Sequence, residues 1–193
     1  MPTLPSASES ASMHAYLPEV VRQLGSAGFY PALINWLCRF FPVDSVSIIS
    51  YSQDQPPKLL FEALTEQERD IFFARFMDGT YIASPSYRGV MENYPPGVYL
   101  WPQLMPDDFR ESDLYKSYYQ ASHIEDLAYI FCTPTPGLHI QLGLGRHYPN
   151  PRFSQSDIAN LYQVSELVLE LVNKHWKITG NDDPPDSVVL SRH

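Results

Sequence analysis

Apolar positions in the N-terminal half of the chain follow first a helical and then a strand-like spacing. From Gly28, apolar side chains recur every three or four residues: Phe29, Ala32, Leu33, Trp36, Leu37 and Phe40. This spacing predicts an amphipathic helix that ends at Pro42. Residues 43–52 then alternate and are rich in β-branched side chains, which predicts a strand. Residues 58–64 predict a second strand, antiparallel to the first.

The next helix is predicted to begin at Thr65, because the run TEQE allows Thr65 and Glu68 to form a capping box. Gly79 suits the C-terminal end of that helix. The stretch GTYIASPSY at 79–87 carries no charge, and we interpret it as chain that crosses a pocket. Residues 93–106 are rich in proline, which predicts an irregular segment with a short strand at 98–101.

The C-terminal half has a similar succession of elements. A helix is predicted over 111–124 with Ser112 as its N-cap, followed by two alternating runs at 125–134 and 137–147. The TPTPG between those runs predicts a β-hairpin with a four- or five-residue loop. Ser154 begins a long helix over 154–176 with a wide, mostly apolar stripe: Ile158, Leu161, Val164, Ser165, Val168, Leu171, Val172 and His175. The width of the stripe predicts a second partner for this helix, such as another subunit.

The order of these elements predicts the fold class. Helices lie at both ends and between two pairs of adjacent strands, and adjacent strands favour antiparallel pairing. We therefore expect an α/β (α+β) fold, an α/β/α sandwich around a central antiparallel sheet. This GAF/PAS-like arrangement is typical of small-molecule sensor domains.

Composition excludes several classes of function. The 193 residues carry a net charge of −9 with no basic run, so the chain itself is not expected to bind nucleic acid. No apolar run approaches the length of a membrane span, and the N-terminus lacks the features of a signal peptide. The two cysteines, Cys38 and Cys132, fit reduced thiols in a cytoplasmic protein.

Neither a catalytic group nor a metal or cofactor site is predicted. His139 and His147 stand roughly 26 Å apart if both lie on one strand, too far to share a metal. Cys132 and His139 could face each other across the hairpin as nucleophile and base, although a buried thiol and a hairpin histidine explain them better. Gly143 and Gly145 mark either the close approach of a ligand or a bulge or tight contact with the last helix.

Several pieces of the chain, in order, resemble a known family. They read FYPALINWLCRFFPVDS, SIISY, FMDGTYIASPSY, GVYLWPQL, YKSYYQASHIEDLAYIF, LHIQLGLGRH and RFSQSDIANL…KHW. Together they resemble, from Phe29 to Trp176, the N-terminal sensor domain of LuxR-type bacterial transcription regulators, the autoinducer-binding, GAF-like group of quorum sensing. The resemblance implies a homodimer with a small-molecule ligand. It also implies that DNA is bound only through a C-terminal helix-turn-helix, whose beginning the final VVLSRH resembles.

This resemblance divides the chain into three parts. Residues 1–13 are interpreted as a disordered leader, 14–176 as the sensor domain, and 177–193 as a linker toward a DNA-binding domain absent from this sequence.

The resemblance also locates a site and shows where this sequence departs from the family. Lactone receptors carry an Asp-Pro pair whose carboxylate binds the ligand amide, and the matching pair here is Ser84-Pro85. A family tryptophan corresponds to Trp101. The Trp-x-x-x-Tyr pair falls near Ile71 and Arg75 and is absent, and a family glycine corresponds to about Leu127. These departures imply a mostly apolar or aromatic ligand rather than a lactone.

Seven residues are the candidate ligand contacts: Phe76, Tyr81, Ser84, Trp101, Tyr129, Gln141 and Gly143. Among them Gln141 alternates with Ile140 and Leu142, so its amide points to the opposite face of the strand and could orient a ligand. The alternative is a ligand-free interaction or dimerisation domain of the same fold, with its pocket filled by its own side chains.

Overall fold

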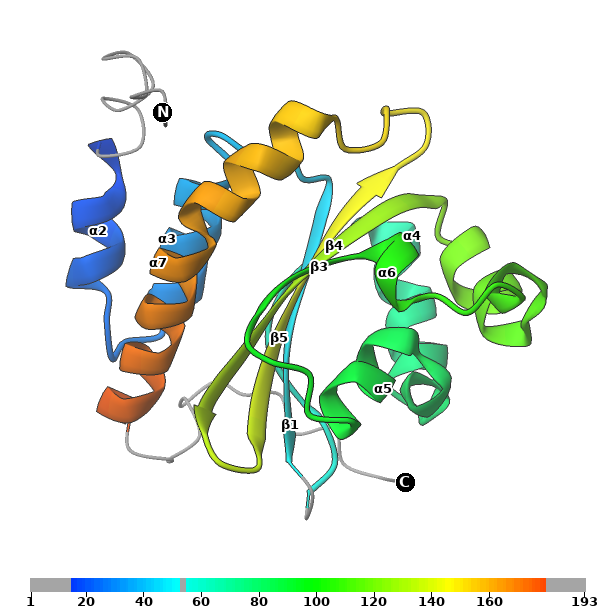
Figure 1. The fold of residues 1–193 in the computed structure, drawn as a ribbon, viewed down its shortest axis with the longest axis horizontal. Coiled ribbons are helices and arrows are strands. Elements are labelled where there is room, and N and C mark those ends of the chain that lie inside the picture. Colours follow the sequence, from blue (N-terminus) through cyan, green and yellow to red (C-terminus); the bar gives the residue numbers. More distant parts are fainter. Residues whose placement is uncertain (1–14, 53–54, 180–193) are drawn as a thin grey trace.

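A five-stranded antiparallel sheet lies between two layers of helices in the computed structural model, which describes residues 15–52 and 55–179 (Figure 1). The sheet has the strand order β2-β1-β5-β4-β3. Its strands are β1 (Ser45–Ser52), β2 (Lys58–Ala63), β3 (Gly97–Leu100), β4 (Ile124–Thr135) and β5 (Leu138–His147). This architecture confirms the predicted sandwich.

The two faces of the sheet are covered by different kinds of helix (Figure 1). One face carries two regular α-helices, α3 (Phe29–Leu37) and the long α7 (Gln155–Thr179), and α2 (Leu17–Arg22) packs against α3 on the side away from the sheet. The other face carries short and irregular helices: α4 (Glu66–Ile71), the π-helix η1 (Phe72–Phe76), the 3-10 helix η2 (Thr80–Ala83), α5 (Pro85–Met91), α6 (Trp101–Leu104), the 3-10 helix η3 (Phe109–Glu111) and the π-helix η4 (Tyr115–Gln120). None of the helices in the described ranges combines the length and the apolar character needed to cross a membrane.

The sheet presents aliphatic side chains to the core beneath α3 and α7. Alternate residues of the three central strands supply it: Val46, Ile48, Ala128, Ile130, Cys132, Ile140, Leu142 and Leu144. The whole apolar stripe of α7 packs into or against this core, including Val164, Leu171 and His175. The width of that stripe, which had predicted a second subunit, therefore has an explanation within the chain.

The segment after Gly79 is more ordered than its sequence predicts. Gly79 has φ +124°, a conformation that favours glycine, and it ends the helical run that starts at Glu66. The chain then forms η2, extends at Ser84 and enters α5 with Pro85 in its first turn. The uncharged stretch 79–87 is thus helical over most of its length, and the region up to Leu104 contains α5, β3 and α6.

Several other expectations change in detail. Only Pro136 and Gly137 separate β4 from β5, a shorter hairpin loop than predicted, because pairing continues to Thr135 and Leu138. Helix α2 was not predicted from the sequence. Helix α7 continues to Thr179, beyond the expected end of the domain at 176. The predicted leader at 1–13 lies outside the described residues, as does the predicted linker from residue 180 on.

His175 of α7 is buried as a neutral base. Its ring stacks on Phe29 at a centroid distance of 4.1 Å, and its Nδ1 accepts a hydrogen bond of 3.0 Å from the Gly25 amide. Nδ1 can accept this hydrogen bond only if it carries no proton. Burial lowers the pKa of His175 to about 4.

The free energy of unfolding should therefore fall as the pH drops from about 6.5 to 4. In that range the unfolded chain binds a proton at His175 that the folded chain excludes, which removes on the order of 3 kcal/mol at the acid end. His175→Phe keeps the stacking and cannot titrate. Urea unfolding of both proteins should show a smaller loss of stability between pH 6.5 and 4 in the variant, and equal pH profiles would contradict the assignment.

Candidate ligand-binding site

The second face of the sheet is built from small and polar side chains where it meets the irregular helices. On β1, Ser45 and Ser47 stand directly opposite Gly145 and Gly143 of β5. Together they form the floor of an internal cavity of about 30 Å³. That volume holds only about two water molecules.

Aromatic rings from the two π-helices form the walls of this cavity. Phe72 and Phe76 come from η1 and stack on each other, with ring centroids 5.3 Å apart. Tyr118 and Tyr119 come from η4, and the Tyr118 ring lies 5.1 Å from that of Phe76. A π-helix is rare and often marks a functional site. Here both π-helices in the described chain present their side chains to the same cavity.

The glycines of β5 keep this space open on the side away from α7. A Cβ at Gly143 would lie 3.0 Å from Ser47 Oγ, and one at Gly145 would lie 2.6 Å from Ser45 Oγ. Both glycines line the cavity, and the register between β1 and β5 is continuous through them. Of the alternatives left open by the sequence, a bulge and a contact with the last helix are therefore wrong.

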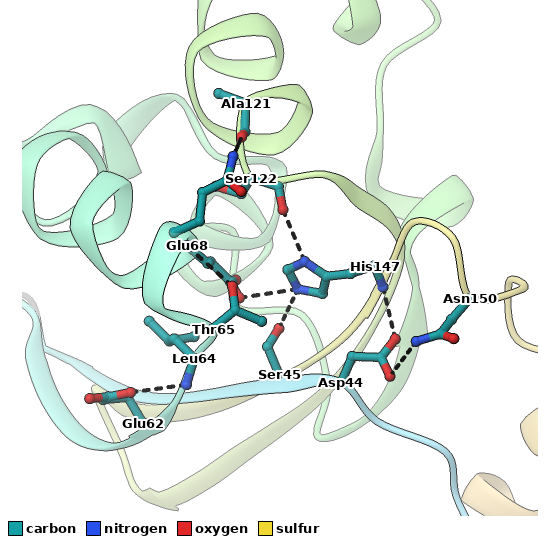
Figure 2. A network of polar contacts seen from close by, with 11 residues as sticks. Asp44, Ser45, Glu62, Leu64, Thr65, Glu68, Ala121, Ser122, His147 and Asn150 are labelled. Atoms are coloured by element: carbon teal, nitrogen blue, oxygen red, sulfur yellow. Dashed lines mark hydrogen bonds and ion pairs between the residues drawn. The ribbon is translucent and has the colours of Figure 1, made fainter.

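One end of the cavity is polar, and Figure 2 shows the contacts that hold it. Glu68 of α4 is 3% exposed, and its Oε2 lies 3.1 Å from Nε2 of His147. The same Nε2 lies 2.8 Å from Ser45 Oγ, while Nδ1 donates a hydrogen bond of 2.9 Å to the Ser122 carbonyl. The backbone N–H of His147 donates to Asp44. The imidazole is thus fixed on both edges and at its backbone.

These contacts favour the protonated form of His147. Because Nδ1 donates to a carbonyl, a neutral ring would turn an unprotonated Nε2 toward the Glu68 carboxylate, which places two acceptors in contact. Burial alone lowers the pKa of His147, but Glu68, the Ser122 carbonyl and Asp44 outweigh it and raise the pKa above its ordinary value. The pair therefore acts as a buried ion pair.

A second polar group separates the cavity from an open groove on the surface. The hydroxyls of Ser84 and Ser86 lie 2.8 Å apart. Ser86 lines the cavity, whereas Ser84 lines the groove, whose volume is about 370 Å³. The start of α5 is therefore the partition between the two spaces.

The predicted ligand contacts fall into two groups. Phe76, Tyr129, Gln141 and Gly143 all line the cavity. The other three are nearby but not on its wall. Ser84 lines the groove, Tyr81 packs among Tyr51, Phe76 and Tyr87, and Trp101 is buried against Tyr115 and Tyr119.

The polar end of the cavity was missed in the sequence. Glu68 was assigned to a capping box, and the structure does show its amide donating to Thr65 Oγ1 at 3.2 Å. Its side chain, however, turns inward to His147. The signal that could have located this face is the pairing of serines on β1 with glycines on β5, while the residues between them are aliphatic.

The fold does not bring together the catalytic pair that the sequence left open. Cys132 lies in the aliphatic core on the far face of the sheet from His139, so the two cannot act as nucleophile and base. Burial raises the pKa of the Cys132 thiol, which makes it unreactive. In the part of the chain that the structure describes, no cluster of three or more His, Cys, Asp or Glu side chains could bind a metal.

Replacing Glu68 should remove a pH-dependent contribution to stability. Because the folded pKa of His147 is raised, its contribution is complete below about pH 6.5 and is lost as the pH rises through the folded pKa. Glu68→Gln should lower the free energy of unfolding at pH 6 by on the order of 3 kcal/mol. The penalty should shrink toward pH 9. Chemical denaturation across pH 6–9 measures it, with the exposed Glu66→Gln as control, and a penalty independent of pH would contradict the ion pair.

Comparison with known proteins identifies the fold. No protein-family model and no curated protein matches the sequence. Among solved structures, the VqsR ligand-binding domain from Pseudomonas aeruginosa is 21% identical with a TM-score of 0.74, covering 90% of this chain and 99% of that one. The LuxR-family factor CepR2 from Burkholderia cenocepacia is 11% identical with a TM-score of 0.65, covering 91% and 100%.

Two further neighbours extend the comparison. SdiA from Escherichia coli is 14% identical with a TM-score of 0.63, covering 91% of this chain and 70% of that one. A phycoerythrobilin-bound GAF domain from a cyanobacterial phytochrome is 11% identical with a TM-score of 0.56, covering 89% and 97%. The chain therefore has the GAF-like fold of the ligand-binding domains of LuxR-type regulators, as its sequence predicts.

Proposed function

We propose that this chain is a small-molecule-sensing regulatory domain of a LuxR-type transcription regulator. The observation that carries the proposal is the difference between the two faces of the sheet. One face is filled by aliphatic side chains, whereas the other places serines, glycines and Gln141 beneath a layer of irregular helices. A sheet that only supported a core would gain stability from larger apolar residues at these positions. The small residues are explained if the space is used by a ligand.

The ligand proposed here is mostly apolar or aromatic with a few polar atoms. CepR2 is described as dependent on N-acylhomoserine lactone, and SdiA has been solved in complex with octanoyl-rac-glycerol. In this chain the position expected to provide a carboxylate to a lactone amide is Ser84, which has no carboxylate and whose buried hydroxyl lies 2.8 Å from that of Ser86. An acylated ligand with a different head group therefore fits better than a lactone.

The cavity must widen to admit such a ligand. Its present volume of about 30 Å³ is far below the roughly 300 Å³ or more of a typical ligand pocket. The helical part of its wall comes mostly from the π-helices η1 and η4, and π-helical turns are frequent at functional sites. We propose that η1, η2 and η4 move outward together when the ligand binds.

The regulatory setting is part of the same proposal. The domain spans residues 14–176 and acts in the cytoplasm as a homodimer, with DNA contacted through a helix-turn-helix outside this chain. On α7, Tyr162 and Leu167 are 46% and 37% exposed, and the contact with a second copy is proposed to involve this helix.

The second candidate function is a ligand-free dimerisation domain. It is favoured by the small cavity and by the aromatic side chains that already occupy the space between helices and sheet. The two candidates differ in one respect, because only a sensor is stabilised by a small molecule.

Binding of 1-octanoyl-rac-glycerol should raise the melting temperature of the domain. At a ligand concentration 100 times the Kd, the stabilisation of about 2.7 kcal/mol corresponds to a shift of about 5–10 °C. Gly143→Val should abolish the shift because its side chain fills the cavity, whereas Thr135→Val, on the same sheet outside the cavity lining, should keep it. Differential scanning fluorimetry measures both. No shift with this lipid or with apolar signal extracts would favour the ligand-free domain.

A further inference from the structure

The cavity contains a buried hydrogen-bond acceptor that has no donor, together with a buried carboxylate. Oε1 of Gln141 accepts no hydrogen bond from any residue of the described chain, although its side chain is only 2% exposed, and Oε2 of Glu68, 3% exposed, is contacted by Nε2 of His147 at 3.1 Å. Both residues line the cavity. An unsatisfied buried acceptor costs about 1–3 kcal/mol, more when it is charged. A molecule that donated hydrogen bonds here would recover that energy.

The charges around the cavity indicate whether such a molecule is anionic, cationic or uncharged. No lysine or arginine is among its described lining residues, so an anionic group would meet the Glu68 carboxylate without a free cation to balance it. A cationic group would have to compete with His147, which lies 3.1 Å from Oε2 and already balances the carboxylate. An uncharged donor, such as a hydroxyl or an amide N–H, adds a hydrogen bond and leaves the ion pair intact.

The position of Glu68 suits this role. Its carboxylate is held at the polar end of the cavity by an imidazole that is itself fixed by Ser122, Ser45 and Asp44 (Figure 2). The other walls combine the rings of Phe72, Phe76 and further aromatic residues with the polar side chains of Ser47, Ser86 and Gln141. The cavity therefore offers a preorganised acceptor among mostly aromatic walls.

We propose that Glu68, positioned by His147, determines ligand specificity in this pocket by accepting a hydrogen bond from an uncharged donor on the ligand. This inference rests on the proposed sensing function. Glu68 on α4, instead of the stretch around Ser84, then provides the carboxylate that binds the ligand. It also assigns a ligand class: molecules with an apolar body and a hydroxyl or amide donor at one end.

Three probes with the same eight-carbon chain test the head group without any mutation. They are 1,2-octanediol, octanoate and octylamine, titrated at pH 7 into the 15N-labelled domain and followed by NMR. The diol should bind about tenfold more tightly than either charged probe, since a hydrogen bond to a charged group is worth about one order of magnitude in affinity. Its binding should also shift the imidazole signals of His147.

Substitution of Glu68 provides a second test of the proposal. Glu68→Gln offers an amide N–H in place of a carboxylate oxygen, so diol binding should weaken about tenfold and octanoate binding should improve. Glu66→Gln, which removes the same charge from an exposed position on the same helix, should leave all three affinities unchanged.

The outcomes separate this inference from the proposed function. If the probes bind the wild-type domain but without preference for the diol, the role of Glu68 is overturned and the sensing function stands. The same holds if Glu66→Gln and Glu68→Gln behave alike in a folded protein. If none of the three probes binds the wild-type domain at millimolar concentration, the apolar-ligand sensor itself is contradicted, and the role of Glu68 fails with it.

Discussion

The pairing of β1 with β5 is the constraint on which the rest of the molecule depends. The register runs without interruption from Ser45 opposite Gly145 to Ser52 opposite Leu138. Because side chains alternate along a strand, this register sends Ile48, Leu142 and Leu144 to the face under α7 and Ser45, Ser47, Gly143 and Gly145 to the cavity. A slip by one residue would exchange the two faces, burying hydroxyls under α7 and filling the cavity with leucine.

Much of the fold could be predicted from the sequence because its periodicities are strong. The aliphatic alternation of residues 137–147 and the helical spacing of 154–176 are signals that few alternative structures satisfy. The cap at Gly79 is equally local, whereas α3 ends at Leu37 and not at Pro42, where the sequence predicted its end. The short helices between Thr80 and Glu111 could not be predicted in this way. They contain proline and aromatic residues, lack a repeated apolar spacing, and are held by packing onto the sheet.

Only part of the candidate site could be predicted from the sequence, for a related reason. Gln141 and Gly143 stand out within their own strand, as does Tyr129 in the next, so a strand-by-strand interpretation finds them. Glu68 and His147 are far apart in the chain and meet only in three dimensions. The residues around Glu68 are also fully explained as the start of a helix. The structure shows one of the two capping-box hydrogen bonds, from the Glu68 amide to Thr65 Oγ1. When a residue has both a local and a long-range role, sequence alone reveals only the local one.

The π-helix η1 has a consequence for how this domain tolerates insertions and deletions. It follows α4 directly, so the extra residue in its wider turn sets the rotational phase between Glu68 and the rings of Phe72 and Phe76. In an α-helix, removing one residue turns everything beyond it by about 100°. A π-helical turn holds one more residue than an α-helical turn, so an inserted residue can be accommodated here without turning the rings of Phe72 and Phe76 away from the side of Glu68. The irregular turn is therefore a phase shift that keeps the polar and the aromatic parts of the wall on one side.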